Sequence, residues 1–120
     1  MKFLMLIKHT EEYRQREIPA ALIEAMTEFV TAKMKEGIIK DTSGLKTTAE
    51  GFRVRSSGGK LKVTDGPFTE AKEMIGGYAM IELPSREAAR ELATRFMELH
   101  VTHWPEFEGE CEIRQVDQGP

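Results

Sequence analysis

The chain has 120 residues and a mass of 13.6 kDa, the size of one domain, and a folded domain of this mass exposes roughly 6,500 Å². A hydrophobic content of 40% beside 31% charged residues excludes a disordered chain and an all-apolar membrane protein. The 17 basic and 20 acidic residues give a formal net charge of -3, which argues against a protein that binds nucleic acid by neutralising phosphates. We therefore expect a single globular domain over residues 1–120 that binds neither nucleic acid nor a membrane.

The cysteine content and the first apolar run predict a cellular compartment. Cys111 is the only cysteine, which excludes an internal disulfide, a CxxC redox pair and a four-sulfur metal site. The apolar run at residues 3–7 is shorter than the core of a signal peptide, which needs about 7 residues or more, and far shorter than a membrane span. We expect a protein of the reducing cytoplasm.

The first part of the chain predicts a strand, a helix and a second strand. Residues 3–7 are apolar at every position, which is typical of a short strand buried on both faces. Pro19 suits a first helical turn and Gly37 a helix end, whereas residues 38–45 hold β-branched residues and predict a short bent strand. The apolar residues that share one face of the helix are Leu22, Met26, Phe29 and Val30.

The middle of the chain predicts a β-hairpin. Residues 52–55 and 60–63 both alternate apolar and basic side chains around Ser57-Gly58-Gly59, and Asp65-Gly66-Pro67 ends the second strand. Counting by two from Leu61 and Val63 places Asp65 in the row that we expect to face inward. A basic ladder on the other face comprises Arg53, Arg55, Lys60 and Lys62.

The last part of the chain predicts a helical turn at residues 69–74, a strand at residues 78–83, a helix and a final strand at residues 111–116. Ser85 is a suitable N-cap for the helix. The apolar face of that helix comprises Ala88, Leu92, Phe96 and Leu99.

The order of these elements is that of an α+β, ferredoxin-like split βαβ fold: an antiparallel sheet with both helices on one face and an inserted hairpin. Because the first strand is apolar on both of its faces, the second face of the sheet also needs a cover, and a second copy in a two-fold homodimer would supply one. His9 shares the row of Phe3, Met5 and Ile7, and we favour this odd row as the one that faces the partner.

The segment VTDGPFTEAKE at residues 63–73, followed by IGGY at 75–78, resembles the DGPF proteins of the YCII-related family. The resemblance extends to MKFLMLI at residues 1–7, Gly44-Leu45 and RVR at residues 53–55, so it covers most of the chain. It implies a dimeric α+β barrel of ferredoxin-like subunits. Members proposed as enzymes carry a histidine near the start of the first helix together with an aspartate, but here that segment is PAAL at residues 19–22. The His/Asp pair of that branch therefore does not transfer whole.

Asp65 and His9 are the candidate catalytic residues. Each is expected at a strand end facing a cavity, where a carboxylate could orient an imidazole for acid–base chemistry. Alternatively, Asp65 fixes the turn before Gly66-Pro67 through backbone hydrogen bonds, and His9 is a partly exposed residue at a strand end.

Arg53, Tyr13 and Tyr78 are the candidate ligand-binding residues, since a guanidinium binds carboxylate or phosphate and a phenol supplies a hydroxyl. Solvation of the hairpin explains the arginine equally well, and aromatic packing explains the tyrosines. His100 and His103 have a spacing at which two histidines can bind a metal, but histidines at a helix C-terminus are favourable without one. No metal or cofactor is predicted.

We expect a protein that binds a small molecule in a cavity between its sheet and the dimer partner, without established catalysis. The alternative is a lyase- or isomerase-like enzyme that uses Asp65 and His9 as an acid–base pair.

Overall fold

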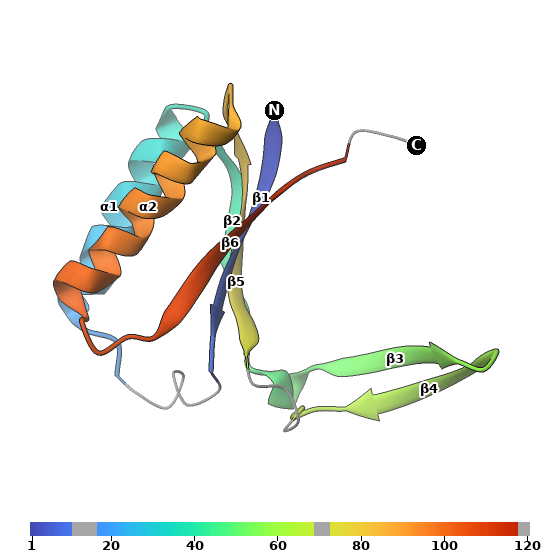
Figure 1. Cartoon of the computed structure of the whole chain (residues 1–120). Coiled ribbons are helices and arrows are strands. Elements are labelled where there is room, and N and C mark those ends of the chain that lie inside the picture. Colours follow the sequence, from blue (N-terminus) through green and yellow to red (C-terminus); the bar gives the residue numbers. More distant parts are fainter. Residues whose placement is uncertain (11–16, 69–72, 118–120) are drawn as a thin grey trace.

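The computed structural model describes residues 1–10, 17–68 and 73–117, which form a mixed α+β chain with two helices (Figure 1). The predicted order of elements, with a hairpin inserted in the middle, is confirmed. The elements are β1 (Lys2–His9), α1 (Ala20–Lys35), β2 (Ile39–Gly44), a 3-10 turn η2 (Thr48–Glu50), β3 (Phe52–Ser57), β4 (Lys60–Asp65), β5 (Met74–Glu82), α2 (Arg86–His103) and β6 (Gly109–Gln115). Of the helical turn expected at residues 69–74, residues 69–72 lie outside the described part, and Met74 begins β5.

The central sheet has four strands in the order β2-β5-β1-β6, and every neighbouring pair is antiparallel. Both helices cover one face of this sheet, and no element of the described chain covers the other (Figure 1). We call the uncovered side the open face. The sheet is open at β2 and β6 and does not close into a barrel.

Helix boundaries follow the local chemistry that the sequence predicts. The Ser85 hydroxyl accepts a hydrogen bond from the backbone N–H of Ala88 at 3.1 Å and so caps α2. Pro19 precedes α1, and Gly37 follows it with a φ of 76°, a conformation that glycine adopts at little cost.

The core lies between the helices and the odd row of β1. Phe3 and Met5 are buried against Leu92 and Phe96 of α2, so the odd row faces the helices. The preference for this row as the one that meets a partner is therefore wrong. An unbroken apolar strand predicts a cover for both faces but does not tell which cover lies on which side. The even row, which contains Leu4 and Leu6, lies on the open face.

The β3–β4 hairpin is a separate two-stranded sheet that projects away from the helix layer, beyond the open face (Figure 1). All residues of both strands are exposed. The expectation that the row of Leu61, Val63 and Asp65 faces inward is wrong for the single chain, because Leu61 is 76% exposed. The basic ladder does lie on the opposite face, where Arg55 pairs with Lys62.

This projection makes the chain extended for its length. The radius of gyration is 16.2 Å, whereas a compact domain of this length has about 14 Å. The exposed surface is 8511 Å², well above the roughly 6,500 Å² expected from the mass.

Candidate functional site

His9, at the end of β1, is buried and has a defined tautomer. Its side chain belongs to the odd row, and the residue is 4% exposed. Nδ1 lies 2.7 Å from the backbone carbonyl of Thr10, and since a carbonyl can only accept, Nδ1 carries the hydrogen. In the neutral ring Nε2 is then an acceptor, which suits it to take a proton or a hydrogen bond.

Gly76 makes room for the imidazole of His9. A Cβ built at this position would overlap the ring at Nε2 and Cδ2. The φ of Gly76 is not positive, so the requirement for glycine is steric rather than conformational. In the sequence Gly76 stands out only as part of a motif, and no spacing pattern relates it to a histidine more than 60 positions earlier.

A cavity of about 330 Å³ lies between the helices and the sheet, and His9 lines it. Gly77 of β5 pairs with Ile7 of β1 on one side and with Gly44 of β2 on the other. The polar lining residues of these three strands therefore lie together at one end of the sheet. The rest of the lining is mainly apolar. The polar and glycine residues of the lining are His9, Thr42, Ser43, Gly44, Gly76, Gly77, Tyr78 and His100, and the larger apolar ones are Met5, Ile7, Ile18, Met26, Phe29, Val30, Ile39 and Phe96.

His100 is a second imidazole in the lining, which the sequence analysis assigned only to the helix end. It is 3% exposed, and its Nδ1 donates to the carbonyl of Phe96 at 3.2 Å. Burial lowers the pKa of His100, and the bond to Phe96 opposes this in part. Its spacing of four residues from Phe96 places it on the buried face of α2, a signal that was available in the sequence.

Asp65 lies in the other sheet, exposed at the end of β4 and paired with Phe52. It does not line the cavity that contains His9. The carbonyl of Thr10 orients the His9 ring, a role that the sequence analysis gave to Asp65. The predicted pairing of Asp65 with His9 stays a prediction.

The residues after Asp65 attach the hairpin to the turn η2. The backbone N–H of Gly66 donates to the carbonyl of Gly51 at 2.9 Å, and that of Phe68 donates to the Thr48 hydroxyl at 3.3 Å. Phe68 is buried, and the Arg53 guanidinium stacks over its ring at 3.7 Å from the centroid. The DGPF segment thus has a visible structural role at the base of the hairpin.

Of the other predicted ligand-binding residues, Tyr78 belongs to the lining of the cavity and Arg53 does not. Arg53 packs on Phe68 at the hairpin base. Tyr78 pairs with Leu6 in the even row, and its hydroxyl donates to Asp41 at 2.9 Å, which raises the pKa of Tyr78. Tyr13 lies outside the described residues.

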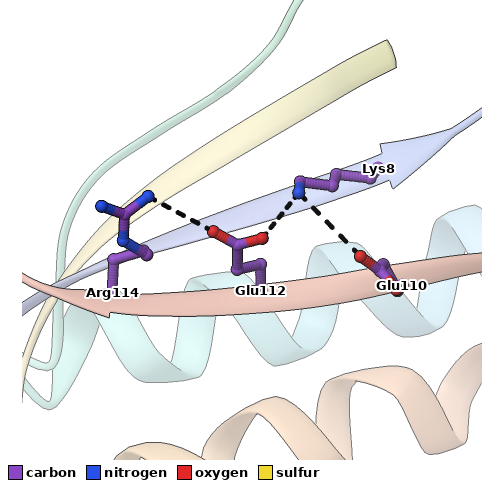
Figure 2. Close-up of polar contacts among 4 residues, drawn as sticks. All are labelled: Lys8, Glu110, Glu112 and Arg114. Carbon is purple, nitrogen blue, oxygen red and sulfur yellow. Dashed lines mark hydrogen bonds and ion pairs between the residues drawn. The ribbon is translucent and has the colours of Figure 1, made fainter. Parts of the chain in front are cut away.

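The open face carries a network of charges beside its apolar centre (Figure 2). Lys8 lies 2.6 Å from Glu112 and 3.9 Å from Glu110, and Arg114 lies 3.6 Å from Glu112. The hydrogen bond with Lys8 lowers the pKa of Glu112 and raises that of Lys8. The open face therefore carries both positive and negative side chains, which ion pairs connect.

The comparisons with known proteins bear on family rather than on activity. No helix of the described residues is long and apolar enough to cross a membrane. No curated protein matches the chain. Among solved structures, a de novo designed protein, Foldit4, is similar at 14% identity and a TM-score of 0.39, with 99% of this chain and 100% of that chain covered. The sequence profile of the YCII-related domain matches residues 1–98, and the chain belongs to this family.

Proposed function

We propose that this protein binds a small molecule in the cavity between its helices and its sheet, beside His9. From the sequence, the cavity is expected between the sheet and a partner. The position of His9 supports the opposite face, because the odd row packs toward the helices. The observation that carries the proposal is a buried imidazole of fixed tautomer at the polar end of an otherwise apolar cavity.

The lining indicates the chemical class of the ligand. Its volume of about 330 Å³ is at the lower end for small-molecule sites, which lie between about 300 and 1,000 Å³. Apolar side chains from both helices favour a compact apolar body. Nε2 of His9 accepts a hydrogen bond when the ring is neutral, so the ligand should carry a hydroxyl, an enol or a protonated carboxyl group at this end.

The proposal is tested by native mass spectrometry of the purified protein, followed by titration with any small molecule that copurifies. His9→Asn is the informative variant, because its amide can still donate to the Thr10 carbonyl while Nε2 is removed. His103→Asn is the matched control, since His103 does not line the cavity. We expect binding to be lost in His9→Asn and retained in His103→Asn. Equal binding by both variants would place the ligand elsewhere.

We also propose that the chain forms a homodimer through its open face. Leu4, Leu6 and Met80 lie on this face, half-buried in the single chain, and their apolar surface supports a second copy as the cover. The strand order β2-β5-β1-β6 is the order expected for a ferredoxin-like subunit of a dimeric α+β barrel. A reducing cytoplasm, which the single cysteine favours, is part of the same proposal.

The second candidate is an acid–base enzyme of the lyase or isomerase kind, and the fixed tautomer of His9 favours it. An imidazole whose Nδ1 is held by a carbonyl is ready to accept a proton at Nε2. In the sequence-based form of this hypothesis Asp65 completes the pair. Asp65→Asn keeps the size and turn propensity of the residue, so the dimer should persist with a modest loss of stability, and turnover should fall sharply. Unchanged turnover, or binding without any turnover, would remove Asp65 from this role.

A further inference from the structure

We propose that the β3–β4 hairpin is a dimerisation arm whose apolar row packs against a second copy of this chain. The inference rests on the homodimer proposed above and assigns a surface that lies outside the central sheet. The apolar row alternates with the basic ladder along both strands. Its members are Phe52, Val54, Leu61 and Val63, which are 68%, 57%, 76% and 63% exposed.

The exposure of this row needs a cover. Four large apolar side chains, each more than half exposed, present on the order of 400 Å², as much as the largest apolar patch of a typical monomer. An isolated two-stranded hairpin is also marginally stable in water unless one face packs against something. Within the described part of the chain, Arg53 contacts Phe68 from the basic face of the hairpin, whereas the apolar row is exposed along both β3 and β4.

The reach of the hairpin indicates a second copy as the cover. Each strand has six residues and is therefore about 20 Å long, whereas stacked sheets lie about 10 Å apart. The hairpin projects on the same side as the open face (Figure 1). A second copy stacked on the open face would therefore lie beside the hairpin, and the two-fold axis would give it an equivalent arm.

The areas support the same arrangement. Four strands at about 4.8 Å spacing and about 20–30 Å in length give the open face a footprint of roughly 500 Å². A stable interface buries about 800 Å² on each partner, so the open face alone is too small. The apolar row of the hairpin is of the size needed to supply the remainder.

The charge distribution also supports a second copy as the cover. Residues 52–65 contain four basic side chains and Asp65, a net charge of +3. Since the whole chain has -3, the remaining residues together carry -6. A basic arm reaching over an acidic body is attractive, and the two-fold axis repeats the attraction.

Sedimentation equilibrium across a range of protein concentrations tests this inference with two double variants. Leu61→Glu with Val63→Glu changes the apolar row, and Ser57→Glu with Thr64→Glu adds the same charge on the opposite face of the hairpin. We expect the first pair to raise the dimer Kd by at least about 100-fold, and the second to change it far less. The changed side chains are exposed in the single chain, so circular dichroism should report folded protein in both.

The outcomes separate the arm from the sheet-face dimer. Equal dimer Kd values for the two double variants would overturn the arm and leave the dimer intact. A monomeric wild-type chain would overturn both. Leu6→Lys, on the open face, tests the sheet-face contact independently, and a dimer that tolerates it but not the hairpin change would be held by the arms alone. If the charged variant fails to fold, Val54→Thr with Val63→Thr keeps the side-chain shape and should raise Kd about tenfold, and an unchanged Kd there would overturn the arm.

Discussion

Gly76→Ala tests the close packing of β5 against His9. The added methyl group would overlap the imidazole, which is buried and held through Nδ1 by the Thr10 carbonyl. The ring must therefore move, and overpacking of this kind costs about 1–3 kcal/mol. Alanine also lowers the conformational entropy of the unfolded chain relative to glycine, which offsets about 0.4–1 kcal/mol of this cost. We expect a net loss of about 1–2 kcal/mol in the free energy of unfolding, measured by urea denaturation.

The control for this experiment is Gly44→Ala, in the strand next to β5. The nearest heavy atom to a Cβ at Gly44 is the Gly76 carbonyl oxygen at 3.9 Å, an ordinary contact, so this change should alter stability by less than about 0.5 kcal/mol. In a His9→Ala background the overlap is gone, and Gly76→Ala should cost at least about 1 kcal/mol less than in the wild type. Equal costs in the two backgrounds would refute the proposed overlap.

Three further outcomes follow from burial elsewhere in the chain. Phe68→Ala should destabilise by about 3 kcal/mol and speed hydrogen exchange at the Gly66 amide, because the buried ring anchors the hairpin base; unchanged exchange would contradict that role. Burial lowers the pKa of His100 in the folded state, so as the pH falls the unfolded chain takes up a proton at this residue before the folded chain does. The stability that neutral His100 contributes is therefore present above about pH 6.5 and is lost as the pH falls below that value. The free energy of unfolding of the wild type should accordingly fall more between about pH 7.5 and pH 5.5 than that of His100→Gln, and parallel curves would contradict this. Burial raises the pKa of Cys111 to about 11, so a thiol reagent at about pH 8 should modify the folded protein far more slowly than the unfolded one; equal rates would show an exposed thiol.

The local structure could be predicted from the sequence because each signal concerns neighbouring residues. Ser85 as a helix cap, Gly37 as a helix end and the alternation around Gly58-Gly59 depend on backbone geometry over a few positions, and the structure contains all three features. The family motif and the order of elements also predicted an antiparallel sheet with an inserted hairpin, which the structure contains.

The assignment of faces could not be predicted from the sequence. Alternation in the hairpin shows that one row is apolar, and the inward direction given to Leu61 and Val63 assumed that this chain itself supplies the cover. The strand at residues 3–7 has the same ambiguity, since both of its rows are apolar. In each case the missing information is long-range: which element, or which second copy, lies above the row.

The site was predictable in part. The register of β1 correctly grouped His9 with Met5 and Ile7, and the structure places all three in one cavity lining. The same counting in β4 could not show that Asp65 belongs to a different sheet. Gly76 became meaningful only once β5 was paired beside β1.

His9 as an oriented acceptor in a ligand cavity is the central feature of the proposed function, and a long-range proton–nitrogen correlation spectrum tests it directly. With selectively labelled histidine, the spectrum reports which ring nitrogen carries the hydrogen and how each responds to a small molecule. At a pH where the ring is neutral, we expect hydrogen on Nδ1 of His9 and a shift of the Nε2 resonance when a small hydroxyl- or carboxyl-bearing compound binds, with His103 unchanged. Hydrogen on Nε2, or an Nε2 resonance that stays fixed while the compound binds, would contradict the account.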